Sequence, residues 1–333
     1  MLEESYKSRI VFHIIGYKEV GLGHIYRSLA LAKELKKYEI LFVCSEVTGL
    51  FAEKLIRDDY LVKIYHQDEI YNEIINLEPK LVISDILSTK AENIKMLKDN
   101  SIKVISFEDL GSGVQYTDLT INELYEVPLI TGKNIYWGSD YFFLRDEFLT
   151  KDSNKYSPKI ESLMISFGGT DPNNLTRVTL DSILNLCKDN DISIHIVTGP
   201  GYSYYENLKE YIKSYNNIHL TYATGVISQI MGTVDIAITS NGRTVYELAH
   251  MSVPSLVISQ HEREDTHTFS KNENGIINIG LYDEEDTPKA IQTWLSKVIK
   301  NQLFYKSLYK KIDKINFSSN KSKVVDIIES FCK

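Results

Sequence analysis

Two α/β domains in tandem, each with a doubly wound parallel sheet, are predicted by three features of this sequence. The chain has 333 residues, which exceeds the usual size of one domain and suits two of roughly 150 residues each. Short β-branched runs alternate with segments of helical period, as α/β sheets require. A glycine turn also follows the first predicted strand of each half, at residues 21–23 and again at 168–169.

The first domain is predicted over residues 1–155. Residues 10–15 are apolar and bounded by Gly16, a pattern typical of a buried parallel strand. Apolar residues at helical spacing then predict an amphipathic helix, at Ile25, Leu29, Ala32 and Leu35. Further strands are predicted at residues 40–44, 81–84, 102–106 and 119–121.

The second domain is predicted over residues 156–333, after a polar stretch at 151–158 that is typical of a linker. Its strands are predicted at residues 163–167, 192–197, 234–239 and 255–258. A helix is expected to start with Thr287 as N-cap and Pro288 at the first helical position. Apolar residues at 324, 327, 328 and 331 predict a last helix, which we assign to this domain.

Composition narrows the class of partner. The net charge of −8 argues against nucleic acid or an anionic membrane surface as the main partner. No apolar stretch approaches the ~18 residues expected of a membrane span. The three cysteines lack pairing or metal-type spacing, which favours a reducing compartment, so we expect a cytoplasmic protein. The oligomeric state is left open.

The first glycine turn carries the strongest chemical signal. Gly21 and Gly23 allow close backbone approach where the strand turns into the helix. His24 follows in the first helical turn, where the helix dipole disfavours an imidazolium. A neutral imidazole can accept a proton, so His24 is a candidate general base. The alternative is that His24 caps the helix or makes a core hydrogen bond.

Two further strand ends have the composition of anion-binding turns. Gly168, Gly169 and Thr170 could cradle a phosphate at the start of the next helix, or else form a tight turn with Thr170 or Asp171 as N-cap. After the strand at 234–239, small and polar residues form a second notch of phosphate size: Asn241, Gly242, Arg243 and Thr244.

Glu247 lies one helical turn beyond that notch, where a carboxylate can accept hydrogen bonds from a ribose diol. The alternative is a surface glutamate near a helix N-terminus. Arg243 could bind a phosphate through two parallel hydrogen bonds, or lie in solvent.

Other polar residues at strand ends are more ambiguous. Residues 259–267 are dense in polar groups, and the spacing of His261, Glu262, Asp265 and His267 could suggest a metal, although we expect none. Asp85 and Asp109 end two strands of the first domain. Each is a candidate contact to a sugar hydroxyl or, equally, a turn residue.

Taken together, these segments resemble the GT-B superfamily, and within it the UDP-sugar hydrolases of the pseudaminic acid pathway. Residues 21–32, GLGHIYRSLALA, look very like that family's GxGHxxRxLxLA signature. Residues 165–171 are similar to its GGTD turn, and residues 238–247 to the strand-end segment whose glutamate holds the ribose.

The resemblance implies two Rossmann-like domains facing across a cleft, and no metal or cofactor. It also implies that His24 activates water to attack the anomeric carbon of a UDP-linked 2,4-diacetamido-2,4,6-trideoxy hexose. Gly23 and the 168–170 turn would stabilise the leaving diphosphate, Glu247 would hold the ribose, and Val226 would meet the uracil edge. Arg27 and Asp85 complete the expected binding residues. After Asp85 the chain has Ile86 and Leu87, where such hydrolases often carry a histidine.

Three other functions are compatible with parts of this pattern. In glycosyl transfer, His24 would deprotonate an acceptor hydroxyl in place of water, and the fold cannot separate the two reactions. A 2-epimerase needs added carboxylates around the sugar, which the sequence does not identify. A non-catalytic binding module fits least, given a base-type histidine and two anion-binding turns.

Overall fold

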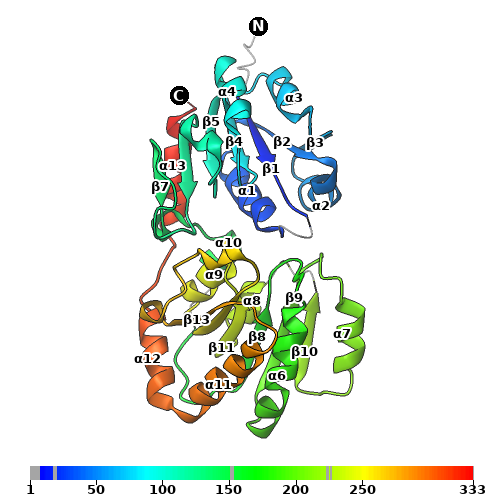
Figure 1. Ribbon diagram of the computed structural model, residues 1–333, viewed down its shortest axis with the longest axis vertical. Helices are drawn as coiled ribbons and strands as arrows, with labels where there is room; N and C mark the ends of the chain where they lie inside the picture. Colours follow the sequence, from blue (N-terminus) through cyan, green and yellow to red (C-terminus); the bar gives the residue numbers. More distant parts are fainter. Residues whose placement is uncertain (1–7, 18–20, 151–153, 223–224, 226, 333) are drawn as a thin grey trace. The chain divides into compact units, whose positions relative to one another are not determined.

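The computed structural model describes residues 8–17, 21–150, 154–222, 225 and 227–332. The chain divides into two compact units (Figure 1). The first comprises Met1–Arg145 together with Ser319–Lys333, and the second comprises Asp146–Ser318.

The first unit contains a seven-stranded parallel sheet of order β3-β2-β1-β4-β5-β6-β7. Strand order reverses between β1 and β4, and such a switch point is where open α/β sheets bind ligands. The strands are β1 (Arg9–Ile14), β2 (Glu39–Ser45), β3 (Leu61–Tyr65), β4 (Leu81–Asp85), β5 (Lys103–Phe107), β6 (Leu119–Asn122) and β7 (Ile135–Trp137). The helices are α1 (Gly23–Glu34), α2 (Glu46–Ile56), α3 (Ile70–Asn76), α4 (Ala91–Asp99) and α13 (Asn320–Ser330).

Both faces of this sheet are buried, which explains why its central strands are continuous apolar runs. Ile10 and Phe12 of β1 pack with α1, α2 and α13 on one face. Val11, between them in sequence, packs with residues of α3 and α4 on the other. The alternation follows from the two-residue period of a strand.

The second unit repeats the architecture with a six-stranded parallel sheet of order β10-β9-β8-β11-β12-β13. Its strands are β8 (Ser162–Ser166), β9 (Ser193–Thr198), β10 (Ile218–Tyr222), β11 (Ile236–Ser240), β12 (Ser255–Ser259) and β13 (Ile276–Leu281). Its helices are α5 (Asp146–Leu149), α6 (Leu175–Asp189), α7 (Tyr205–Ile212), α8 (Ile227–Met231), α9 (Thr244–His250), α10 (Glu262–Asp265), α11 (Asp286–Lys300) and α12 (Gln302–Ile312). Helices α6 and α11 pack with β8, β9 and β11 in one core.

Every strand predicted from the sequence is present within one or two residues of its expected position. The four strands that were missed, β3, β7, β10 and β13, are the four sheet edges. An edge strand is covered on fewer sides, so its sequence need not be a continuous apolar run. The burial of β3 illustrates this, since all five of its residues are partly or fully exposed.

The division of the chain differs from the predicted one in two respects. The first unit ends at Arg145, ten residues before the expected boundary at 155. The last helix, α13, belongs to the first unit (red in Figure 1). The physical reason is packing, because Val324 and Ile328 lie in the same apolar core as Ile10 and Phe12.

The predicted N-cap at Thr287 is wrong, since α11 already begins at Asp286. The carboxylate of Asp283 accepts hydrogen bonds from the backbone N–H groups of Glu285 and Asp286, at 2.9 and 2.8 Å. The hydroxyl of Thr287 accepts in return from the N–H of Asp283 at 2.9 Å. This reciprocal pair satisfies the orphan donors of the first turn, which is the function of a capping box.

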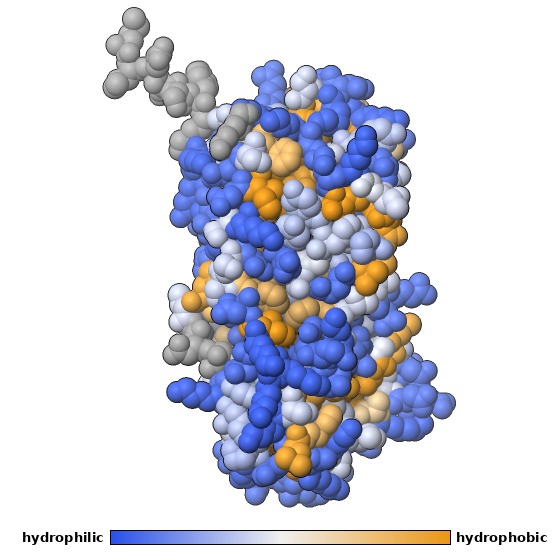
Figure 2. Space-filling view, turned by 90° about the vertical axis from the view of Figure 1, so that its left-hand side faces the viewer, coloured by the Kyte–Doolittle hydropathy of each residue, from blue (hydrophilic) through white to orange (hydrophobic). Residues whose placement is uncertain are grey.

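On the face drawn in Figure 2, hydrophilic residues cover most of the surface and apolar groups are scattered among them. Within the described part of the chain, no helix combines the length and apolar character that crossing a membrane would need.

Candidate functional site

The turn after β1 has the conformation that its glycines predict. Gly21 has a φ of +85°, in the left-handed region that disfavours residues with a Cβ atom. Helix α1 starts at Gly23, with Leu22 at the N-cap position and no side-chain capping bond. His24 therefore lies in the first turn of α1, as predicted, and does not cap the helix.

His24 forms a buried pair with Asp85, the last residue of β4. Nδ1 of His24 lies 2.6 Å from Oδ1 of Asp85, and the side chains are only 8% and 1% exposed. A carboxylate accepts from an N–H, so Asp85 favours the tautomer with the proton on Nδ1 and the lone pair on Nε2. Among the described residues, Nε2 has no hydrogen-bond partner.

Arg27 lies one helical turn after His24 with a fully buried side chain. Its Nε donates to Oδ2 of Asp85 at 2.8 Å, and its Nη2 pairs with Oδ1 of the same carboxylate. Its Nη1 lies 3.0 Å from Oε1 of Glu108 and 2.9 Å from Oε1 of Glu123. Arg27 was expected to bind substrate, but its buried guanidinium is directed at three carboxylates, and its Nη2 lies 3.1 Å from Nδ1 of His24.

Electrostatics stabilises the charged forms of this cluster. Burial opposes the charge of Arg27, yet attraction to Asp85 and Glu108 raises the Arg27 pKa above its ordinary value. Burial likewise opposes the charge of Asp85, but Arg27 and His24 hold the pKa of that carboxyl well below its usual range. Asp85 is therefore an ionised partner of His24, and both of its oxygens are engaged by the protein.

Asp109 has a structural function instead. Its Oδ1 accepts from the backbone N–H groups of Thr89 and Gly111, at 2.9 and 2.8 Å. Its Oδ2 accepts from the Thr89 hydroxyl. The turn-residue interpretation of Asp109 is confirmed.

In the second unit, Gly168 and Gly169 form the turn directly after Phe167. Gly168 has a φ of +78°. Gly169 lies against a glycine loop after β9, because the carbonyl of Gly169 accepts from the N–H of Gly201 at 2.9 Å. This loop was not predicted from the sequence. A Cβ added at Gly199 would lie 2.4 Å from the Gly169 Cα, so this loop needs glycine to approach the turn.

The N-terminus of α6 is already capped by a side chain. Oδ1 and Oδ2 of Asp171 accept from the backbone N–H groups of Leu175 and Thr176, both at 2.8 Å. Burial raises the pKa of Asp171 in spite of these two donors. Asp171 therefore occupies the helix end where a phosphate was expected. The remaining candidates for anion binding at this turn are Gly168, Gly169 and the buried Thr170.

Asn241, predicted to bind ligand, organises the loop after β12. Its Nδ2 donates to the carbonyls of Glu264 and His267, at 2.8 and 3.0 Å. Its Oδ1 accepts from the Ser270 hydroxyl at 2.6 Å, and its carbonyl lies 2.7 Å from Nδ1 of His267. The amide group of Asn241 is thus engaged by the protein.

The other residues of this strand end lie where the sequence places them. Gly242 precedes α9, Arg243 is its N-cap residue and Thr244 is its first residue. Glu247 is buried, so it is not the surface glutamate of the alternative interpretation. Val226 lies outside the described residues.

Glu264 was missed by sequence reasoning. Its Oε2 accepts from the N–H of Gln260 at 2.8 Å. Burial raises the pKa of Glu264 to about 7, with a further contribution from Asp171, although the N–H groups of Gln260 and Asn241 oppose the shift. This carboxyl therefore titrates near neutral pH.

The possible metal ligands of the loop do not converge. His267 is buried against Asn241, and His261 accepts from the Glu264 N–H at 3.3 Å. Glu262 and Asp265 are exposed. Over the described ranges, no three His, Cys, Asp or Glu side chains are grouped as metal ligands.

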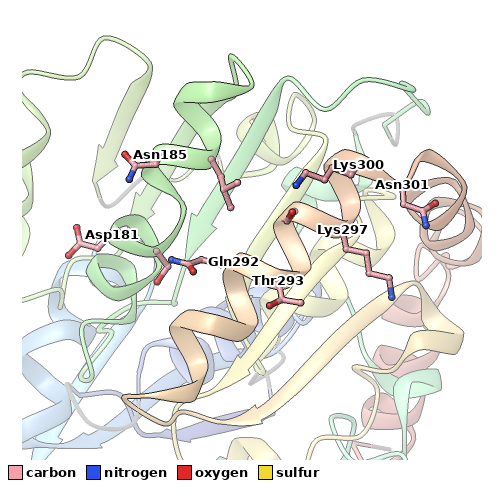
Figure 3. Close-up of a pocket in the computed structure, with 10 residues that line it drawn as sticks. Asp181, Asn185, Gln292, Thr293, Lys297, Lys300 and Asn301 are labelled. Carbon is pink, nitrogen blue, oxygen red and sulfur yellow. The ribbon is translucent and has the colours of Figure 1, made fainter.

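An open groove of about 760 Å³ lies elsewhere, between α6 and α11 (Figure 3). Asp181, Gln292 and Lys297 are among its lining side chains. None of the predicted site residues lines it.

Solved structures of other proteins have a similar architecture. MurG of Acinetobacter baumannii superposes with a TM-score of 0.65 at 13% identity, over 97% of this chain and 99% of that one. The spinosyn rhamnosyltransferase SpnG, solved with thymidine diphosphate, superposes with a TM-score of 0.65 at 10% identity, over 98% and 100%. At these identities the likeness shows the fold alone, which is the predicted GT-B fold of two Rossmann-like units.

Three relatives were found by sequence. An uncharacterized protein of Methanocaldococcus jannaschii is 29% identical over 74% of this chain, and the match spans only 54% of that longer protein. The spore coat polysaccharide biosynthesis protein SpsG of Bacillus subtilis is 26% identical over 80% of this chain and 81% of its own length.

The third relative is the UDP-2,4-diacetamido-2,4,6-trideoxy-beta-L-altropyranose hydrolase of Campylobacter jejuni. It is 27% identical over 72% of this chain and 87% of its own length. No protein-family model matches the chain.

Proposed function

We propose that this chain is a nucleotide-sugar hydrolase that converts a UDP-activated 2,4-diacetamido-2,4,6-trideoxy hexose to UDP and the free sugar. The product would feed nonulosonic acid biosynthesis of the pseudaminic type, for surface glycans. The observation that carries the proposal is the His24–Asp85 pair, 2.6 Å apart at the switch point of the first sheet. The sequence similarity to the Campylobacter hydrolase supports the choice of substrate class.

His24 is the general base in this mechanism. Its Nε2 takes a proton from water while the water oxygen attacks the anomeric carbon. The bond from that carbon to the diphosphate oxygen breaks, and its electron pair leaves with UDP. Asp85 holds the imidazole in the required tautomer and stabilises the imidazolium that forms.

The second unit would bind the nucleotide. Backbone N–H groups of the 168–170 turn and of the 241–244 notch are suited to the diphosphate, because oriented amides bind anions without a broad basic surface. Gly23 would contribute the same chemistry from the first unit. Glu247 would accept the ribose hydroxyls, and Val226 would meet the uracil edge.

Glycosyl transfer uses the same fold and the same base, and no observation favours it over hydrolysis. The glycosyltransferases among the solved structures support the fold only, at 13% identity or less. A 2-epimerase would need carboxylates that face the sugar. The structure does gather Asp85, Glu108 and Glu123, but all three are buried and directed at Arg27.

The test is to incubate the protein with a panel of UDP-sugars and no acceptor, and to follow UDP and free sugar by NMR. The panel should contain UDP-2,4-diacetamido-2,4,6-trideoxy hexoses and UDP-N-acetylglucosamine. We expect release of UDP together with one equivalent of free reducing sugar from a deoxyamino sugar. Absence of release from every such sugar would overturn the hydrolase, and release only after an acceptor is added would indicate transfer.

A further inference from the structure

We propose that Glu108 is a positioning residue of the base, which favours the imidazolium formed when His24 accepts a proton. The inference rests on the function proposed above and adds a residue that the sequence motifs do not include. It is carried by the place of Glu108 beside His24, by its backbone conformation and by its contact with Arg27.

Glu108 directly follows β5, and its carboxylate lies beside two residues of α1, His24 and Arg27. Its Oε2 lies 3.7 Å from Nδ1 of His24, and its Oε1 lies 3.0 Å from Nη1 of Arg27. The side chain is 8% exposed, so water screens these interactions little. Glu108 is thus a second carboxylate beside the nitrogen that Asp85 already holds.

The backbone of Glu108 is in an unfavourable conformation. Its φ of +50° lies in the left-handed region, which disfavours residues with a Cβ atom. The N–H of Glu108 donates to the carbonyl of Ile121 at 3.0 Å, which anchors the residue to the end of β6. Backbone strain of this kind gathers at functional sites, where the surrounding structure holds it.

The carboxylates of Asp85, Glu108 and Glu123 all lie beside the guanidinium of Arg27. The groups that face the His24 imidazole are Asp85 from β4, Arg27 from α1 and Glu108 after β5. The two carboxylates that face the imidazole, Asp85 and Glu108, favour a proton on His24, whereas Arg27 and the N-terminus of α1 oppose it.

Glu123 provides a matched comparison within the same cluster. It follows β6 as Glu108 follows β5, and its Oε1 lies 2.9 Å from the same Nη1 of Arg27. Its side chain is fully buried. Neutralising Glu123 therefore removes a carboxylate beside Arg27, whereas neutralising Glu108 also removes one that lies 3.7 Å from Nδ1 of His24.

The experiment compares Glu108→Gln with Glu123→Gln in the full chain. The pH dependence of kcat/KM for UDP release should show its acid limb displaced downward by about one pH unit or more in Glu108→Gln. The displacement in Glu123→Gln should be clearly smaller. We expect kcat to fall in Glu108→Gln with KM nearly unchanged, because the Glu108 carboxylate is directed at His24 and Arg27. Equal displacement in the two variants, or none in Glu108→Gln, would overturn the inference.

A second measurement separates this inference from the proposed function. The imidazole titration of His24 can be followed by NMR without substrate, with the His24 signal assigned from a His24→Gln sample. Its midpoint should move down by about one pH unit or more in Glu108→Gln. If the wild type releases no UDP from any nucleotide sugar while this midpoint moves, the reaction is wrong and the pairing of Glu108 with His24 stands.

Glu108→Asp guards against a folding defect, since it keeps the charge with a shorter side chain. Unfolding curves of all variants show which are folded. In folded Glu108→Asp, the midpoint of the His24 titration should lie closer to the wild-type midpoint than to the Glu108→Gln midpoint. A midpoint equal to that of Glu108→Gln would contradict the importance of the charge.

Discussion

At the scale of single residues, the pair of His24 and Asp85 combines a candidate base with the group that orients it. Asp85 accepts from Nδ1 and also binds Arg27 and the Ser28 hydroxyl, so its own position is fixed by several bonds. A carboxylate held this way loses little freedom when the imidazole becomes charged, which is the preorganisation that base catalysis needs.

Replacement of His24 by Ala should lower kcat for UDP release by roughly 10²–10⁴, the usual contribution of a general base. Asp85→Asn should cause a loss of comparable order, because an amide cannot favour the same tautomer equally well. Initial rates by UDP detection measure both effects. His66, an exposed histidine whose Nδ1 lies 3.8 Å from Oδ2 of Asp68, provides the control, and His66→Gln should leave the rate almost unchanged. Full activity in His24→Ala would contradict its assignment as base.

Glu264 should make the stability of the second unit depend on pH between about 4.5 and 7. Its pKa is raised to about 7 from 4.5, so the folded state retains a proton that the unfolded state has lost in this window. The free energy of unfolding then falls as pH rises through the window, by about 1–3 kcal/mol for such a shift in a partly exposed residue. Glu264→Gln should remove this contribution.

The measurement is urea unfolding of both proteins at pH 5 and at pH 8. The difference between the two pH values should be smaller in Glu264→Gln than in the wild type. An identical pH dependence in the two proteins would show that Glu264 keeps an ordinary pKa.

At the scale of elements, the loop after each strand decides which polar groups are presented at the edge of the sheet. Asp171 caps α6 with both oxygens, and Asn241 holds the loop that follows β12. The two backbone N–H groups that Asp171 satisfies and the side-chain amide of Asn241 are therefore no longer free for a ligand. The second unit therefore has fewer groups available to bind an anion than its glycine and polar residues alone indicate.

Asp171→Ala should destabilise the protein by about 1 kcal/mol, because two N–H groups at the start of α6 lose their acceptor. Asp181→Ala is the matched control on the same helix. Its carboxylate pairs with Arg177 at 2.8 Å on the surface and should contribute at most about 0.5 kcal/mol. Urea unfolding curves compare the two, and equal losses would contradict the capping function.

At the scale of the whole molecule, the chain leaves the first unit near residue 145 and returns to it with α13. Ile328 is fully buried in the core of the first unit, whereas Leu295 of α11 is fully buried in that of the second. The last fifteen residues thus stabilise the unit with which the chain begins.

Ile328→Ala should destabilise the first unit by roughly 2–4 kcal/mol, as a cavity in a packed core does. Hydrogen exchange should then accelerate in β1, β2 and β4, while β8, β9 and β11 change little. Leu295→Ala should give the reverse pattern. Accelerated exchange throughout the chain in both variants would contradict two separate cores.

Much of the architecture follows from the sequence, because central parallel strands must be apolar on both faces and are then easily recognised. β1, β4 and β8 are of this kind. The edge strands β3 and β13 are not, and their mixed patterns gave no signal. The C-terminal helix has clear helical spacing, but its apolar stripe does not specify which core it enters. That choice depends on packing between residues more than 300 positions apart, such as Ile10 and Ile328, which belong to one apolar core.

The sequence by itself determined the two-sheet architecture, the glycine turns and the place of His24 at the start of α1, since these depend on residues close together in the chain. Only the tertiary structure decided the partners of His24. Asp85, Glu108 and Glu123 each follow a different strand, and the parallel sheet places those strand ends side by side next to α1. Glu108 and Asp109 are neighbours in sequence, but their carboxylates have different partners. The backbone of Glu108 is left-handed and its carboxylate faces His24 and Arg27, whereas the carboxylate of Asp109 holds the turn at Thr89. The local sequence does not predict these partners, because they come from segments that are far apart in the chain.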